Sequence, residues 1–250
     1  MLIYKIICYV YSNCLSFLEN KFLKKKIKAN ELEINGFSKI NYINPDILSY
    51  KRIKSINFNN YHKRIIYSQA DIEDLIIHLF KNNFQNTLEK LTGFKYSIDF
   101  FGAYENFHII NKDVKNGYFA NHYHLDKPYS KNLLKIFIPF TQVDFEDGPL
   151  QVIDKINSLK ILKGKLRIEE VIPHSLTLTK DEILLFKPNI CWHRAKNPAP
   201  FHSTKMIMLQ LNPSKEWLIS KYLYRRQFKN EPKFTKVKNL FSMEFNRINI

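Results

Sequence analysis

The chain changes from a helical to a β-type pattern after Gly93, and this change limits the available folds more than any other feature. Short runs rich in β-branched and aromatic residues follow, and residues typical of turns separate them. No helical pattern of any length lies between the runs, as a parallel sheet with crossover helices would need. The sequence therefore predicts an antiparallel sandwich or barrel. The runs are Tyr96–Tyr104, Tyr118–Asp126, Leu133–Phe140, Leu150–Ile153, Ser175–Leu178, Ile183–Phe186 and Met206–Leu211.

The N-terminal residues have the spacing of an amphipathic helix. Apolar residues recur every three or four positions from Ile3 to Phe22, and lysines follow between positions 21 and 28. We expect residues 1–30 to form a basic amphipathic helix that is too short and too polar to span a bilayer. Such a helix more often packs its apolar stripe on its own domain with the lysines outward, and the alternative is an anionic membrane surface.

The chain of 250 residues is long enough for one ordinary domain with a flank. Residues 29–69 are expected to be irregular, and Ala70–Leu91 to form one helix that stops at Gly93. We assign residues 31–225 to a single β-barrel domain with a helical flank, and residues 226–250 to a C-terminal tail.

Charge and cysteine content narrow the class of protein further. The chain has 39 basic and 23 acidic residues, which gives a net charge of +16. This excess suits a polyanionic partner such as nucleic acid, a phosphorylated small molecule or a membrane surface, although a codon bias toward lysine also contributes. Three scattered cysteines exclude a disulfide framework and a four-cysteine zinc site. Low cysteine usage is typical of the cytoplasm, with a peripheral position at a membrane as the alternative.

Three residues have the pattern of a metal site: His124 and Asp126 in "HYHLD", and His193 in "CWHRA". Alternate side chains of a strand point to the same face, so His124 and Asp126 can reach one ion from one short segment. A second strand can bring His193 to the same ion. Two imidazoles and one carboxylate that leave further positions open are the ligand set of non-haem Fe(II) oxygenases.

The order of motifs around these residues resembles the phytanoyl-CoA dioxygenase-like branch of the Fe(II)/2-oxoglutarate-dependent oxygenases. The HxD motif is followed by "LLKIFIPFTQVD", the acidic turn "EDGPL", the strand and second histidine in "TKDEILLFKPNICWHRA", and "HSTKMIMLQL". The resemblance covers about residues 70–212. It implies a mainly β fold with flanking helices, a double-stranded β-helix of the jelly-roll or cupin-like type, preceded by an α-helical N-terminal region.

The same resemblance implies the cofactors and the roles of residues. His124, Asp126 and His193 would be the catalytic iron ligands, with Fe(II) as metal and 2-oxoglutarate as cosubstrate. Lys205 stands where the family usually has an arginine for the distal carboxylate of 2-oxoglutarate, and Asn111 corresponds to an asparagine that contacts the cosubstrate. The implied reaction is hydroxylation of a small organic substrate, which would be anionic if the basic surface borders the site. Retention of Asp126 disfavours halogenation.

Two other functions stay open from the residues alone. His122, His124 and His193 could hold zinc and activate water. A non-catalytic basic barrel could instead bind nucleic acid or an anionic membrane through exposed aromatic and basic residues. We expect a small-molecule substrate and no nucleic acid, and the sequence does not define the oligomeric state. The C-terminal cluster that the non-catalytic reading would use is Tyr222, Tyr224, Arg225, Arg226 and Phe228.

Overall fold

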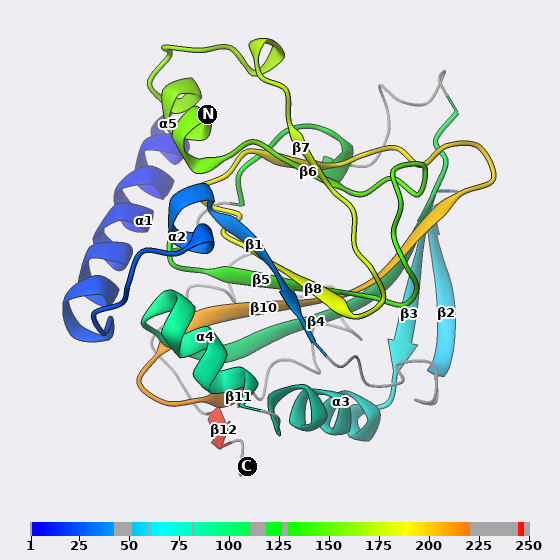
Figure 1. Ribbon diagram of the computed structural model, residues 1–250, viewed down its shortest axis with the longest axis horizontal. Helices are drawn as coiled ribbons and strands as arrows, with labels where there is room; N and C mark the ends of the chain where they lie inside the picture. Colours follow the sequence, from blue (N-terminus) through cyan, green and yellow to red (C-terminus); the bar gives the residue numbers. More distant parts are fainter. Residues whose placement is uncertain are drawn as a thin grey trace.

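The computed structural model describes residues 2–42, 52–59, 61–81, 83–110, 119–126, 130–220 and 245–247. Two antiparallel sheets face each other, and helices cover the outer face of the larger one (Figure 1). This arrangement is mainly β and jelly-roll-like, and it confirms the expected fold class. Asn111 and the C-terminal aromatic and basic cluster lie outside the described residues.

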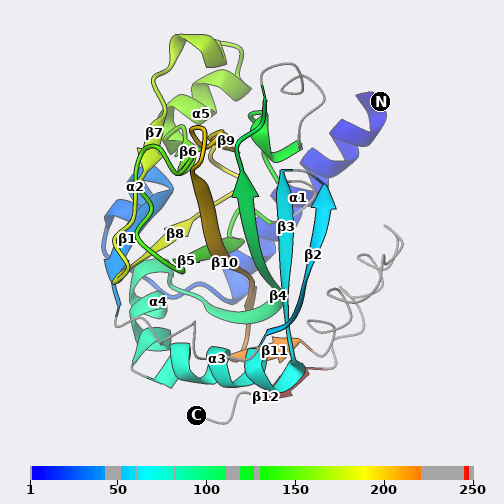
Figure 2. The same cartoon turned by 90° about the vertical axis from the view of Figure 1, so that its right-hand side faces the viewer.

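Over the described residues the larger sheet has nine strands, and its central path runs in the order β1-β8-β5-β10-β4 with antiparallel pairing throughout. Strands β3 and β2 continue it beyond β4, as Figure 2 shows from the side, while β11 pairs parallel with β4 and then with β12. The strands are β1 (Phe37–Asn41), β2 (Arg52–Asn59), β3 (His62–Tyr67), β4 (Lys95–Phe107), β5 (Leu134–Pro139), β8 (Glu182–Phe186), β10 (Ser203–Ser214), β11 (Leu218–Ser220) and β12 (Phe245–Arg247).

The smaller sheet has three strands in the order β7 (His174–Leu176), β6 (Leu150–Val152) and β9 (His193–Ala195). An isolated antiparallel bridge between His124 and His193 adds one further rung beside β9. We expected a strand through Tyr118–Asp126, but among its described residues only His124 pairs in this way, after a short 3-10 turn at Phe119–Asn121.

Two hydrophobic clusters divide the interior. One fills the space between the larger sheet and the helices α3 (Gln69–Lys81) and α4 (Phe84–Thr92). The other lies between the two sheets and contains Phe137, Val152 and Phe186. Because strand side chains alternate, each central strand supplies both clusters: on β10, Ile207 and Leu209 face the helices, whereas Met206 and Met208 face the space between the sheets.

The helical regions differ from expectation in several places. The single helix expected over residues 70–91 is two helices, because Asn83 has a left-handed backbone with φ of 57° between α3 and α4. The segment 29–69, which we expected to be irregular, contains the short helix α2 (Glu31–Asn35) and strands β1, β2 and β3.

The N-terminal helix α1 spans Leu2–Phe22 and so ends earlier than the helix expected over residues 1–30. The helix α5 (Lys155–Leu162) and a 3-10 turn at Ile168–Glu170 lie between β6 and β7, where we expected no helical pattern. Within the described part of the chain, no helix is both long and apolar enough to cross a membrane.

Candidate metal centre

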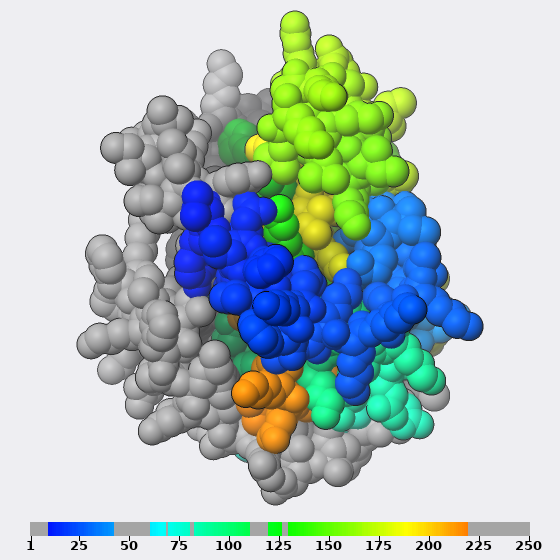
Figure 3. Space-filling view, turned by 90° about the vertical axis from the view of Figure 1, so that its left-hand side faces the viewer, coloured from blue at the N-terminus to red at the C-terminus, as the bar shows by residue number. Residues whose placement is uncertain are grey.

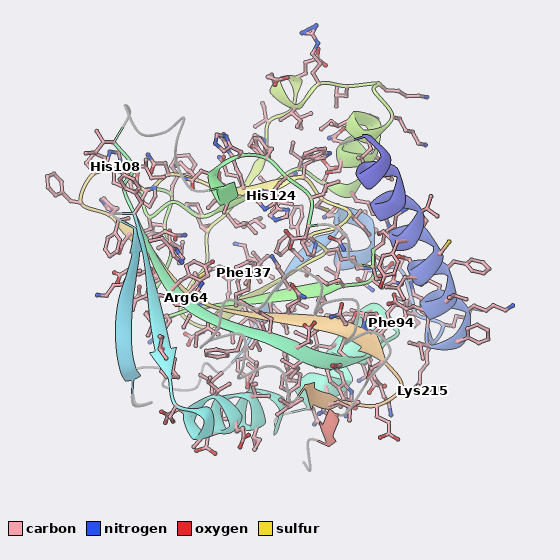
Figure 4. The ribbon with its side chains drawn as sticks, turned by 180° about the vertical axis from the view of Figure 1, so that it is seen from behind. Arg64, Phe94, His108, His124, Phe137 and Lys215 are labelled. Atoms are coloured by element: carbon pink, nitrogen blue, oxygen red, sulfur yellow. The ribbon has the colours of Figure 1, made fainter. Side chains whose placement is uncertain are left out.

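His124 and His193 stand directly opposite each other on neighbouring backbone segments of the smaller sheet. Each donates its backbone N–H to the carbonyl of the other, with N to O distances of 3.0 and 3.1 Å. Their ring centroids are 4.3 Å apart. The pairing therefore places both imidazoles on the same side of the sheet, toward the space between the sheets, where Figure 4 labels His124 above Phe137 of the larger sheet.

Asp126 joins the two histidines from the end of the same short segment, as the HxD spacing predicts. Its backbone N–H donates to the carbonyl of Pro188, and its Oδ1 lies 3.7 Å from Nε2 of His124 and 3.8 Å from Nε2 of His193. One ligand atom from each residue lies within 4.8 Å of the others. Among the described residues, this is the one group of histidine, cysteine and acidic side chains arranged to hold a metal ion.

The Nδ1 atom of each imidazole makes a hydrogen bond that orients the ring for metal binding. Nδ1 of His124 is 2.7 Å from the carbonyl oxygen of His122, and Nδ1 of His193 is 3.0 Å from that of Cys191. A carbonyl oxygen can only accept, so each neutral ring carries its proton on Nδ1 and presents the lone pair of Nε2 to Asp126. The ring of Phe186 packs edge-on against His193 at 4.9 Å and fixes its plane further.

The charge states also suit a cation. Burial lowers the pKa of His193 to about 3, although the carboxylate of Asp126 acts in the opposite direction. Burial by itself would raise the pKa of Asp126, but attraction to Lys135, His193 and His124 outweighs it and holds this pKa below its ordinary value. At neutral pH the site therefore holds a neutral His193 and an ionised Asp126, as ligands of a divalent metal require.

Lys135 is the residue of the site that the sequence reasoning missed. It lies on β5 with Phe137, whose side chain faces the space between the sheets, and its Nζ is 2.5 Å from Oδ2 of Asp126. Its side chain is only 13% exposed. The signal was present in the sequence, since a lysine interrupts the otherwise apolar run "LLKIFIPF".

Lys205, the expected cosubstrate residue, is not brought to the triad. We expected its strand face, shared with Ile207 and Leu209, to look into the barrel, but that face of β10 packs toward the helices. Lys205 is instead paired in register with Glu105 of β4, and its Nζ lies 5.0 Å from the ring centroid of Phe140. The inward-facing neighbour is Thr204, whose hydroxyl donates to the carbonyl of Gly148 at 2.9 Å.

Two other polar residues near the triad point elsewhere. Arg194 donates from Nε to Oε1 of Gln151 at 2.8 Å, and its guanidinium lies 4.6 Å from the ring centroid of Tyr123, on the face of the smaller sheet opposite to His193. The side chain of His122 is exposed, and it is the backbone carbonyl of this residue that contacts His124. The arrangement therefore disfavours a zinc site built from His122, His124 and His193.

The fold and this cluster define the chain as a jelly-roll-like protein with a His-Asp-His centre between its two sheets. No protein-family model matches the sequence, and no curated protein matches it. Among solved structures, it resembles the non-heme alpha ketoglutarate dependent epimerase SnoN from nogalamycin biosynthesis, with a TM-score of 0.51, 12% identity, and coverage of 73% of this chain and 79% of SnoN.

Two further solved structures match less closely. HygX from Streptomyces hygroscopicus, with nickel and 2-oxoglutarate bound, has a TM-score of 0.47 and 6% identity over 74% of this chain and 86% of its own. EctD from S. alaskensis in its apoform has a TM-score of 0.47 and 11% identity over 77% of this chain and 78% of its own. At these identities, the likeness to SnoN establishes a common fold alone.

Proposed function

We propose that this protein is a Fe(II)- and 2-oxoglutarate-dependent oxygenase that acts on a small organic molecule. The observation that carries the proposal is the triad of His124, Asp126 and His193, with both Nε2 atoms directed at one carboxylate oxygen. Two neutral imidazoles and one carboxylate are the ligand set of non-haem Fe(II) oxygenases. The fold shared with SnoN, which is described as alpha ketoglutarate dependent, supports the same class.

The residues of the site fit this cofactor chemically. The Nδ1 hydrogen bonds of His124 and His193 hold the rings in the ligating tautomer before any metal binds, which reduces the reorganisation that binding requires. Lys135 occupies Oδ2 of Asp126 and leaves Oδ1 for the metal, so Asp126 would serve through a single oxygen. When bound, Fe(II) and 2-oxoglutarate activate dioxygen and couple the decarboxylation of 2-oxoglutarate to oxidation of the substrate.

We assign Lys135 the role that the sequence resemblance gave to Lys205. The charges of Lys135 and Asp126 cancel, and a divalent ion then leaves two positive charges in a site shielded from water. The two carboxylates of 2-oxoglutarate would restore neutrality. Because the metal competes for the charge of Asp126, the ammonium of Lys135 needs a new anionic partner, and the cosubstrate supplies one.

Hydroxylation is the reaction we propose, because the carboxylate ligand Asp126 is present and no halide position is freed. Membership of the phytanoyl-CoA dioxygenase-like branch remains part of the proposal, and rests on the motif order around the two histidines. SnoN, which shares the fold, is described as an alpha ketoglutarate dependent epimerase, so the fold alone does not decide the reaction.

Anaerobic reconstitution with Fe(II), followed by titration with 2-oxoglutarate, tests the proposal. We expect one iron per chain, a metal-to-ligand charge-transfer absorption when 2-oxoglutarate is added, and release of succinate in air. His193→Ala should lose iron binding, whereas His202→Ala should retain it, because His202 is 45% exposed and pairs with Asp147 away from the triad. Tight zinc binding without iron or 2-oxoglutarate binding would instead favour a zinc enzyme.

A further inference from the structure

The N-terminal helix α1 contacts its own domain through polar side chains. The backbone N–H of Lys131 donates to Oγ of Ser16 at 2.8 Å, and Nδ2 of Asn132 donates to Oε2 of Glu19 at 2.9 Å. One turn earlier, Nζ of Lys131 donates to Oδ1 of Asn13 at 2.6 Å. Ser16 and Glu19 are both buried, so this polar side of the helix is the one that faces the protein.

Over Val10–Phe22, where the side chains of α1 are described, the apolar side consequently faces outward, contrary to the arrangement expected from the sequence. The exposed fractions are 52% for Val10, 64% for Phe17, 50% for Leu18 and 69% for Phe22. These residues are separated by seven, one and four positions, so at 3.6 residues per turn they lie on one side of the helix and form a stripe. In Figure 3 the helix lies at the front of the molecule, shown in blue.

Basic side chains border this apolar stripe. Lys21 lies within it, with its Nζ 5.4 Å from the ring centroid of Phe22, and the exposed residues Lys25, Lys26 and Lys28 follow. Lys25 pairs with Glu89 but keeps a side chain that is 70% exposed. The one acidic residue of α1 is Glu19, which is turned toward the domain. The outward side of Val10–Phe22 therefore combines apolar and positive character, and Glu19 points away from it.

We propose that this stripe of Val10, Phe17, Leu18 and Phe22, together with the adjoining lysines, binds an anionic membrane surface, with α1 lying in the plane of the interface. Aromatic and aliphatic side chains on one face with lysines at its border are the composition of interfacial helices. A second copy of the chain is a poorer partner for the stripe, because pairing two such helices would bring lysines together without acidic side chains on the outward side of either helix.

Binding to vesicles tests this directly, using the full chain and independently of its activity. We expect sedimentation with phosphatidylcholine vesicles that contain about one third phosphatidylglycerol, weak binding to pure phosphatidylcholine, and weaker binding as NaCl rises from about 0.1 M to about 0.5 M. Phe17→Gln combined with Phe22→Gln should weaken binding by about tenfold or more. Each phenyl ring leaves water when the helix binds, and a glutamine side chain loses this hydrophobic gain.

Ile172→Gln is the matched control, since Ile172 is 91% exposed and belongs to the segment between the 3-10 turn at Ile168–Glu170 and β7 instead of to α1. It should bind vesicles like the unchanged protein. The double variant alters only outward side chains, so its melting temperature should stay the same, which separates loss of binding from loss of fold. Failure of the full chain to bind anionic vesicles, or equal binding by the double variant, would overturn the proposal. So would a dimer of the full chain that the double variant dissolves, because the stripe would then be a self-association surface.

Discussion

The ammonium of Lys135 lies 2.5 Å from Oδ2 of Asp126, while the Nε2 atoms of His124 and His193 approach the other oxygen, Oδ1. The two oxygens of the Asp126 carboxylate thus have different partners. Oδ2 pairs with the ammonium of Lys135, and Oδ1 faces the two imidazole nitrogens that would bind a metal together with it. Lys135 is placed there by strand alternation on β5, which also turns Phe137 toward the same interior.

This relationship predicts a specific defect in cosubstrate binding. Lys135→Met should weaken 2-oxoglutarate binding by roughly 30-fold to several-thousand-fold, because losing one partner of a buried charge pair costs about 2–5 kcal/mol. The midpoint of the charge-transfer band in an anaerobic Fe(II) titration measures it. Lys205→Met is the matched control and should leave the midpoint unchanged, since this lysine lies on the opposite face of the sheet.

Iron binding separates this role from a purely positioning one. A cation beside a metal site opposes the binding of a second cation, so Lys135→Met should bind Fe(II) as tightly as the unchanged protein, or more tightly. If Lys135 acted only by holding Asp126 in place, iron and 2-oxoglutarate affinities would fall together. An unchanged 2-oxoglutarate midpoint in Lys135→Met would remove the lysine from the cosubstrate site altogether.

Metal should also stabilise the folded chain. The triad exists only in the folded state, so Fe(II) at about a hundred times its dissociation constant should add about 3 kcal/mol and raise the melting temperature by about 5–10 °C under anaerobic conditions. A chelator should reverse the shift. His193→Ala should show little of it, and an equal shift in that variant would place the bound metal elsewhere.

The sequence was sufficient for the parts of the site that depend on local spacing. His124 and Asp126 are two residues apart on one extended segment, so their shared orientation follows from the geometry of a strand. Lys205 could not be oriented in the same way. The turn between β9 and β10 includes Phe201, with a left-handed φ of 68°, and counting residues across such a turn does not preserve which face a side chain takes.

Lys135 was missed for a different physical reason. Strand β5 is buried on both faces, with Ile136 and Ile138 toward the helices and Phe137 toward the opposite sheet. A strand of this kind has no polar side to mark its orientation, so the sequence does not reveal which cavity a lone lysine enters. The break at Asn83 was equally hidden, because the apolar spacing continues through it from α3 into α4.

Gly36 gives a test of the packing behind His193. This glycine has φ of +85°, and a Cβ atom at this position would lie 2.2 Å from Sγ of Cys191. Gly36→Ala should therefore lower the free energy of unfolding by about 2 kcal/mol or more, through both strain and overpacking. Chemical denaturation measures this value.

A second substitution separates the two causes. The double variant Gly36→Ala/Cys191→Ala lacks the Sγ atom. Adding Gly36→Ala to Cys191→Ala should therefore lower the free energy of unfolding by less than adding it to the unchanged protein, and the remaining loss is the strain of the positive φ. The backbone carbonyl that orients His193 is kept in both proteins. Strictly additive losses would show that the contact between the two side chains contributes nothing.

Glu19 predicts how stability depends on pH. Burial raises its pKa to about 7, although hydrogen bonds from Ser130 and Asn132 act in the opposite direction. Between pH 4.5 and 7 the folded chain holds a proton on Glu19 that the unfolded chain has released, so the contribution of Glu19 to the free energy of unfolding should fall by about 3 kcal/mol over this range and stay level above it. The lowered pKa of His193 acts in the opposite direction at acid pH, so the contribution of Glu19 is measured as a difference between variants. Glu19→Gln keeps an oxygen for both donors and removes this contribution, so its stability relative to the unchanged protein should rise by about 3 kcal/mol between pH 4.5 and 7 and leave it the more stable protein at pH 8. Urea denaturation at several pH values measures the effect, and Glu169→Gln, at an exposed position, should retain the slope of the unchanged protein. A stability difference between Glu19→Gln and the unchanged protein that does not change with pH would assign this contribution to another group.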